Sequence, residues 1–91
     1  MATAIGKIYI DYEEGLHARP AAAFAHLASS RQNCEVTVTC NNEVVNGKSI
    51  MSLLTLGAGH GSELIIQVDG EDPEALVDEL LELVRQRFHI Q

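Results

Sequence analysis

The chain has 91 residues, which suits one small domain with a single hydrophobic core, and hydrophobic residues make up 46% of it. Its formal net charge of −7 argues against a nucleic-acid-binding protein, because such proteins carry a basic surface. No apolar run reaches the roughly 20 residues needed to cross a bilayer, and the N-terminus lacks the pattern of a signal peptide. We therefore expect a cytoplasmic protein, without membrane insertion, in which residues 1–91 form a single domain.

The first half of the chain predicts a strand, a helix and a β-hairpin. Residues 7–10 alternate in polarity, as a strand does. From His17 the pattern becomes helical, with apolar residues that share one stripe: Ala21, Phe24, Leu27 and Ala28. Residues 34–40 alternate cleanly, and the turn signal at 41–42 leads into a return strand at 43–45.

The second half predicts a short helix, a strand and a longer helix. Ser49 is a favoured N-cap for a helix that ends at Gly57, and residues 63–69 alternate as a fourth strand. Asp72 as cap and Pro73 at the first position mark the start of the last helix. Its apolar stripe comprises Val77, Leu80, Leu81, Val84 and Phe88. The order β-α-β-β-α-β-α predicts an α+β open-faced β-sandwich, in which a four-stranded antiparallel sheet carries three helices on one face.

The two cysteines, Cys34 and Cys40, lie on one predicted strand. Their separation along an extended strand is roughly 20 Å, whereas a disulfide needs Cα atoms within about 7 Å. We therefore expect two free, buried thiols. Neither the cysteines nor the four histidines have the spacing of metal ligands, so we expect no metal and no cofactor.

The stretch GLHARP at residues 15–20 places a histidine and an arginine at a predicted helix start. The first amides of a helix lack intrahelical acceptors and attract an anion such as phosphate. Arg19 adds a planar fork of donors, and Pro20 costs little where the amide would have no partner. These residues would suit a phosphoryl group carried on His17. The spacing alone nevertheless favours the simpler interpretation of an exposed histidine and arginine with no chemical role.

The stretches GLHARPAA (residues 15–22) and NGKSIMSLLTLGAGHGSEL (residues 46–64) together resemble the histidine-containing phosphocarrier (HPr) family of the bacterial sugar phosphotransferase system. The resemblance covers essentially the whole chain. It implies that His17 accepts a phosphoryl group on Nδ1 from enzyme I and passes it to the A domains of enzymes II. Arg19 would stabilise the phosphate. The chain would then be a carrier component of a phosphotransferase system and not an independent enzyme.

The resemblance also implies a regulatory site and a docking surface. Ser49 matches the serine that a serine-specific HPr kinase/phosphorylase modifies in some bacteria, with Ser52 and Thr55 as weaker alternatives. The docking residues would be Ile50, Met51, Lys48 and Phe24, with Leu53, Leu54 and Leu56 serving the core. We expect a monomer.

One feature leaves the partner range open. Relatives often carry lysines further along the first helix, where this chain has His26 and Ser29, so its docking face would be less basic.

His26, His60 and His89 are expected to be solvent-exposed without a chemical role. Two alternative functions remain: a paralogue in the nitrogen-regulatory branch, and a ligand-binding regulatory module of the same fold in which the histidine is incidental.

Overall fold

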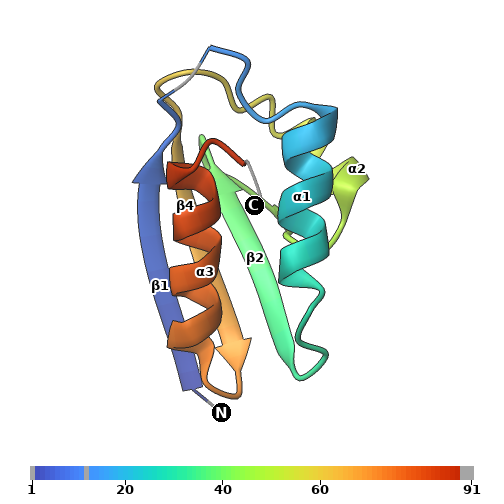
Figure 1. The fold of residues 1–91 in the computed structure, drawn as a ribbon, viewed down its shortest axis with the longest axis vertical. Coiled ribbons are helices and arrows are strands. Elements are labelled where there is room, and N and C mark those ends of the chain that lie inside the picture. Colours follow the sequence, from blue (N-terminus) through green and yellow to red (C-terminus); the bar gives the residue numbers. More distant parts are fainter. Residues whose placement is uncertain (1, 12, 89–91) are drawn as a thin grey trace.

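The computed structural model describes residues 2–11 and 13–88, and it has the element order expected from the sequence (Figure 1). Four strands and three helices follow one another along the chain: β1 (Ala2–Tyr9), α1 (Ala18–Ala28), β2 (Cys34–Cys40), β3 (Glu43–Asn46), α2 (Ile50–Thr55), β4 (Glu63–Gly70) and α3 (Pro73–Arg85).

The strands form one antiparallel sheet in the order β1-β4-β2-β3, and the helices lie on one of its faces (Figure 1). The open-faced α+β sandwich is therefore confirmed. The central strand β4 pairs with β1 from Ala2↔Gly70 to Tyr9↔Glu63. This pairing starts β1 at Ala2, five residues before the strand expected from alternation at residues 7–10.

The core lies between the sheet and the helices. Every second residue of β2 faces it, and these side chains are at most 2% exposed: Cys34, Val36, Val38 and Cys40. Both cysteines are free, and the Cys34 Sγ lies 3.2 Å from the carbonyl oxygen of Glu71. Strand alternation thus accounts for the burial of both thiols. Among the described residues no helix is long and apolar enough to span a membrane.

Ser49 and Asp72 both occupy their predicted N-cap positions, but only Ser49 caps its helix with its side chain. Ser49 has extended backbone angles, and its Oγ accepts a hydrogen bond from the Ser52 amide at 3.2 Å, which confirms it as the N-cap of α2. Asp72 occupies the cap position of α3, but its φ of 46° is left-handed and its side chain makes no cap bond. The predicted cap position and the following proline are therefore confirmed, but the side chain does not cap the helix, because it would reach the N2 or N3 amide only from an extended backbone.

Candidate functional site

His17 stands directly before α1, at its N-cap position, with an extended backbone and an exposed side chain. The imidazole makes no capping hydrogen bond, so it is not committed to the helix end. Helix geometry leaves the Ala18 and Arg19 amides without intrahelical acceptors, and Pro20 has no amide hydrogen. The ring therefore lies in solvent beside the positive end of an eleven-residue helix, as predicted.

Arg19 is exposed in the first turn of α1, two residues after His17. It takes part in no ion pair within the described part of the chain. Its guanidinium is therefore available to an anion held at the helix start. The preceding loop is acidic, with Glu13 and Glu14 exposed, and Asp11 lies 3.6 Å from the Nε of Arg87.

The loop that carries His17 is fixed by contact with the segment after α2. The Leu16 amide donates to the Ala58 carbonyl at 2.8 Å, and Leu16 itself is only 5% exposed. Gly15 has a φ of +66°, and a Cβ there would lie 2.5 Å from the Ala58 oxygen and 2.8 Å from the Gly59 Cα. The two sequence motifs thus meet at the site. Sequence reasoning missed Ala58, because a main-chain acceptor carries no residue-type signal.

The surface beside the site is formed by α1 and α2. Ile50 is 43% exposed, Met51 74% and Leu54 37%. A depression of about 440 Å³ lies between the two helices, lined by Ala22, Ala25, His26, Ser29, Lys48 and Ile50. The Lys48 Nζ donates to the Arg31 carbonyl at 3.0 Å, which ties the start of α2 to the end of α1.

Two expectations about this surface need correction. Phe24, proposed as a docking residue, is 1% exposed, because the apolar stripe of α1 turns its ring into the core. Leu54, expected in the core, is partly exposed, whereas Leu53 and Leu56 are buried at 0% and 6%. Leu54 therefore extends the exposed apolar surface of Ile50 and Met51.

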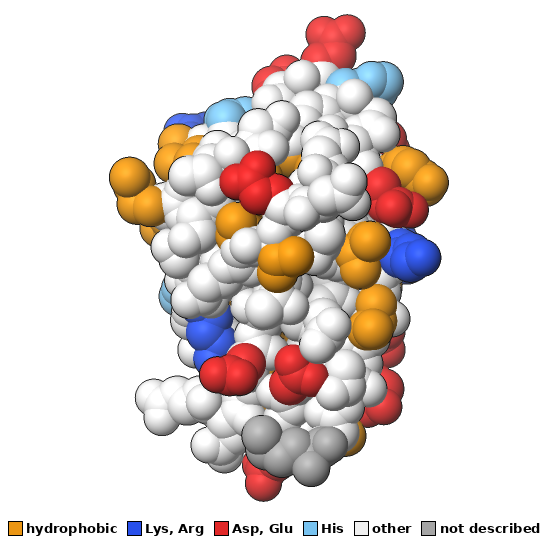
Figure 2. All heavy atoms as spheres, turned by 180° about the vertical axis from the view of Figure 1, so that it is seen from behind, with side chains coloured by type: hydrophobic (Ala, Val, Ile, Leu, Met, Phe, Trp, Pro, Cys, Tyr) orange, Lys and Arg blue, Asp and Glu red, His pale blue; other side chains and the backbone are white. Residues whose placement is uncertain are grey.

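The opposite face of the sheet is uncovered (Figure 2). Its hydrophobic side chains lie singly or in small groups between acidic ones, and Ile5, Tyr9 and Val44 are each about 60% exposed (58%, 63% and 63%). This scattered arrangement contrasts with the adjoining apolar side chains on α2.

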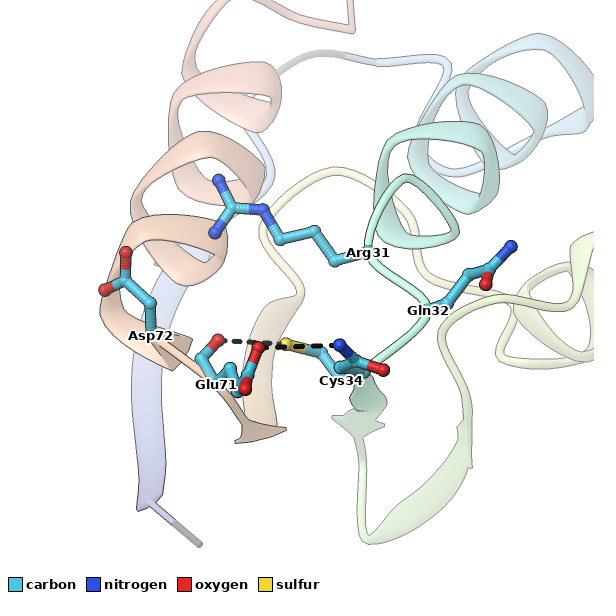
Figure 3. Close-up of a pocket in the computed structure, with 6 residues that line it drawn as sticks. Arg31, Gln32, Cys34, Glu71 and Asp72 are labelled. Atoms are coloured by element: carbon cyan, nitrogen blue, oxygen red, sulfur yellow. Dashed lines mark hydrogen bonds between the residues drawn. The ribbon is translucent and has the colours of Figure 1, made fainter.

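A small pocket of about 280 Å³ lies beyond the C-terminal end of α1, between the starts of β2 and α3 (Figure 3). Arg31 at its rim pairs with Glu79 at 2.5 Å, and the Asn33 side-chain amide donates to the Glu71 carboxylate at 3.4 Å. Arg31, Asn33 and Glu71 are thus engaged in bonds, and α1 separates the pocket from His17 (Figure 1).

Two further histidines lie within the described residues. His26 is exposed on α1, and His60 is exposed in the turn that Gly59 and Ser62 close. His89 lies outside the described residues. No group of three or more His, Cys, Asp or Glu side chains in the described ranges could hold a metal ion.

Comparison with known proteins agrees with this arrangement. The family described as the PTS HPr component phosphorylation site matches residues 6–86. The phosphocarrier protein HPr of Pseudomonas aeruginosa is 44% identical over 75 residues, which cover 81% of this chain and 82% of that protein. HPr of Cupriavidus necator is 39% identical over 74 residues, again covering 81% of this chain and 82% of that protein. A crystal structure of HPr from Thermoanaerobacter tengcongensis matches with a TM-score of 0.88 at 34% identity, covering 97% of this chain and 98% of that one. The chain therefore belongs to the HPr phosphocarrier family of the phosphotransferase system.

Proposed function

We propose that His17 carries a phosphoryl group between enzyme I and the A domains of enzymes II. The observation that carries this proposal is the exposed imidazole of His17, which makes no capping bond at the N-terminus of α1, with Arg19 two residues further on in the first turn. In the forward step the bond between the donor and phosphorus breaks as the His17 Nδ1–phosphorus bond forms. In transfer to an enzyme II, the acceptor attacks the same phosphorus, and the His17 Nδ1–phosphorus bond breaks as the new bond forms.

The shallowness of the site supports a carrier. An exposed phosphoryl group remains accessible to a second partner, whereas an enclosed one would be trapped. Arg19 and the free amides of the first turn of α1 would offset the charge of the phosphoryl oxygens. We expect this stabilisation to be modest, because both the guanidinium and the ring lie in water.

We further propose that partners dock on the adjoining apolar side chains of α2 and that phosphorylation of Ser49 hinders them. Ile50 and Met51 directly follow Ser49 and are exposed, with Lys48 beside them. A phosphate on Ser49 would place about −1.5 to −2 charges next to side chains that docking must desolvate. The cytoplasmic location, the monomeric state and the sugar branch, as opposed to the nitrogen-regulatory branch, stay predictions.

The test is phosphorylation by enzyme I and phosphoenolpyruvate, followed by intact-mass measurement. Wild-type protein should gain one phosphoryl group that acid removes, and His17→Ala should gain none. His26→Ala and His60→Ala are matched controls, since both rings are exposed, and both should label like wild type. Full labelling of His17→Ala would refute the proposal, and would favour the alternative of a regulatory module with an incidental histidine.

A further inference from the structure

The Ala58–Gly59 peptide is held at both ends by groups from different parts of the site. Its carbonyl accepts from the Leu16 amide at 2.8 Å, and its N–H donates to the Ser62 Oγ at 3.1 Å. A peptide unit is planar, so fixing the N–H direction also fixes the carbonyl direction. One rigid plane therefore joins the Ser62 hydroxyl to the residue before His17.

Ser62 is itself anchored by its backbone. Its amide donates to the Gly59 carbonyl at 3.0 Å, and its carbonyl accepts from the Ile10 amide at 2.9 Å. The Gly61 amide in turn donates a hydrogen bond to the Ile10 carbonyl at 2.7 Å. The hydroxyl is thus presented from a turn fastened to the end of β1, which makes it a fixed acceptor.

Without the Ser62 hydroxyl, the Gly59 N–H would lose its hydrogen-bond acceptor, and the bond from Leu16 would be left to orient this peptide. Gly57 precedes this peptide and Gly59 is part of it, and a Cβ at either position would meet nothing within 4 Å. Glycine is conformationally permissive, so the bond to the Ser62 hydroxyl adds a restraint that no side chain at these two positions supplies. A hydrogen bond at one end of a peptide also polarises the group at the other, which strengthens the bond from Leu16.

We propose that Ser62 is a positioning residue for phosphoryl transfer at His17, acting through the Ala58–Gly59 peptide and the Leu16 amide. Ser62 neither touches the ring nor binds the phosphoryl group in this role; it limits how far the His17 loop can move. The inference rests on the proposed function of His17, which it deepens. A neutral hydrogen bond is worth about a two- to tenfold change in an equilibrium constant, so the effect should have this size.

The experiment compares Ser62→Ala, Ser62→Thr and the control Ser30→Ala. Ser30 suits as control because its hydroxyl also bonds a main-chain group, the Leu27 carbonyl at 2.6 Å, but at the other end of α1. Amide hydrogen exchange of Leu16, the NMR signals of the His17 ring and the transfer rate from enzyme I are measured on each folded protein.

Ser62→Ala should speed Leu16 exchange, shift the His17 ring signals and slow transfer, the rates changing about two- to tenfold. Ser62→Thr retains a hydroxyl and should restore all three readouts, and Ser30→Ala should leave them at wild-type values. A purely structural Ser62 would lower the melting temperature alone.

Three results would overturn the inference: wild-type Leu16 exchange in Ser62→Ala, a wild-type transfer rate despite faster exchange, or a failure of Ser62→Thr to restore the rate. If the wild-type protein accepts no phosphoryl group, the proposed function fails. The Leu16 exchange and His17 ring signals then still decide whether Ser62 holds this loop.

Discussion

Replacement of Gly15 by alanine tests whether the contact between the two motifs holds the site. Gly15 has a φ of +66°, which costs a non-glycine residue about 1–2 kcal/mol. The new Cβ would also lie 2.5 Å from the Ala58 oxygen, well inside the roughly 3.5 Å of ordinary contact. The backbone must therefore shift, and the bond from the Leu16 amide to the Ala58 carbonyl would weaken or break. A lost hydrogen bond adds about 1–2 kcal/mol, so Gly15→Ala should cost about 2–4 kcal/mol in all.

Gly57→Ala is the matched control. Gly57 has a nearly equal φ of +60°, but a Cβ there meets nothing within 4 Å. It should pay the backbone strain alone, about 1–2 kcal/mol. The difference between the two variants then isolates the contact with Ala58.

The assay is thermal unfolding of both variants, with transfer from enzyme I measured where each is folded. For a domain of this size 1 kcal/mol corresponds to about 4–8 °C in Tm, so the difference should be readily measured. Gly15→Ala should also slow transfer to His17, whereas Gly57→Ala should slow it less. Equal losses of stability in the two variants would show that the approach of Gly15 to Ala58 does not stabilise the fold.

Three further predictions concern charge. Arg19→Ala should slow transfer roughly tenfold, as expected for a lost charge-assisted bond of ~1.5–3 kcal/mol, and should change stability by no more than about 0.5 kcal/mol; the opposite pattern would make Arg19 structural. Ser49→Asp should keep its native circular-dichroism spectrum and Tm but accept phosphoryl groups more slowly, with the deficit shrinking at high salt, and a wild-type rate at low salt would contradict the docking block. The Thr3 hydroxyl, followed by the Gln67 amide, lowers the pKa of Asp69 by donating to its carboxylate. Thr3→Val should therefore raise that pKa in an NMR titration and remove stability at neutral pH, a deficit that vanishes as pH falls and Asp69 is protonated; an unchanged pKa would show that the bond is absent in solution.

The elements were predictable where local pattern decides them. In β2 the two-residue alternation alone assigns Cys34 and Cys40 to the core face, and both are 2% exposed. The start of β1 was not predictable from local pattern, because residues near Ala2 become a strand through pairing with β4, a partner more than sixty residues away. Residue type correctly placed Asp72 at the N-cap of α3, but its missing side-chain bond could not be predicted, because the left-handed backbone after β4 is not visible in the local pattern.

The candidate site divides in the same way. The position of His17 and Arg19 at a helix start follows from local sequence, since Pro20 and the apolar stripe mark where α1 begins. The burial of Phe24 was also predictable, because Phe24 belongs to the apolar stripe of α1. The docking role predicted for Phe24 was inconsistent with that stripe. The tether from Leu16 to Ala58 joins segments about forty residues apart through main-chain atoms, so no side-chain pattern announces it.

This division explains how an acidic loop could carry the phosphoryl site proposed at His17. Main-chain bonds hold the segment that bears His17, and they do not depend on the charge of neighbouring side chains. Glu13 and Glu14 are exposed, so water and salt screen their repulsion of a phosphoryl group. Their charge should therefore tune how long His17 retains the group without moving the ring. For a carrier, weaker retention of the phosphoryl group favours its transfer to the next partner. The position of His17 and the charge around it can therefore vary independently.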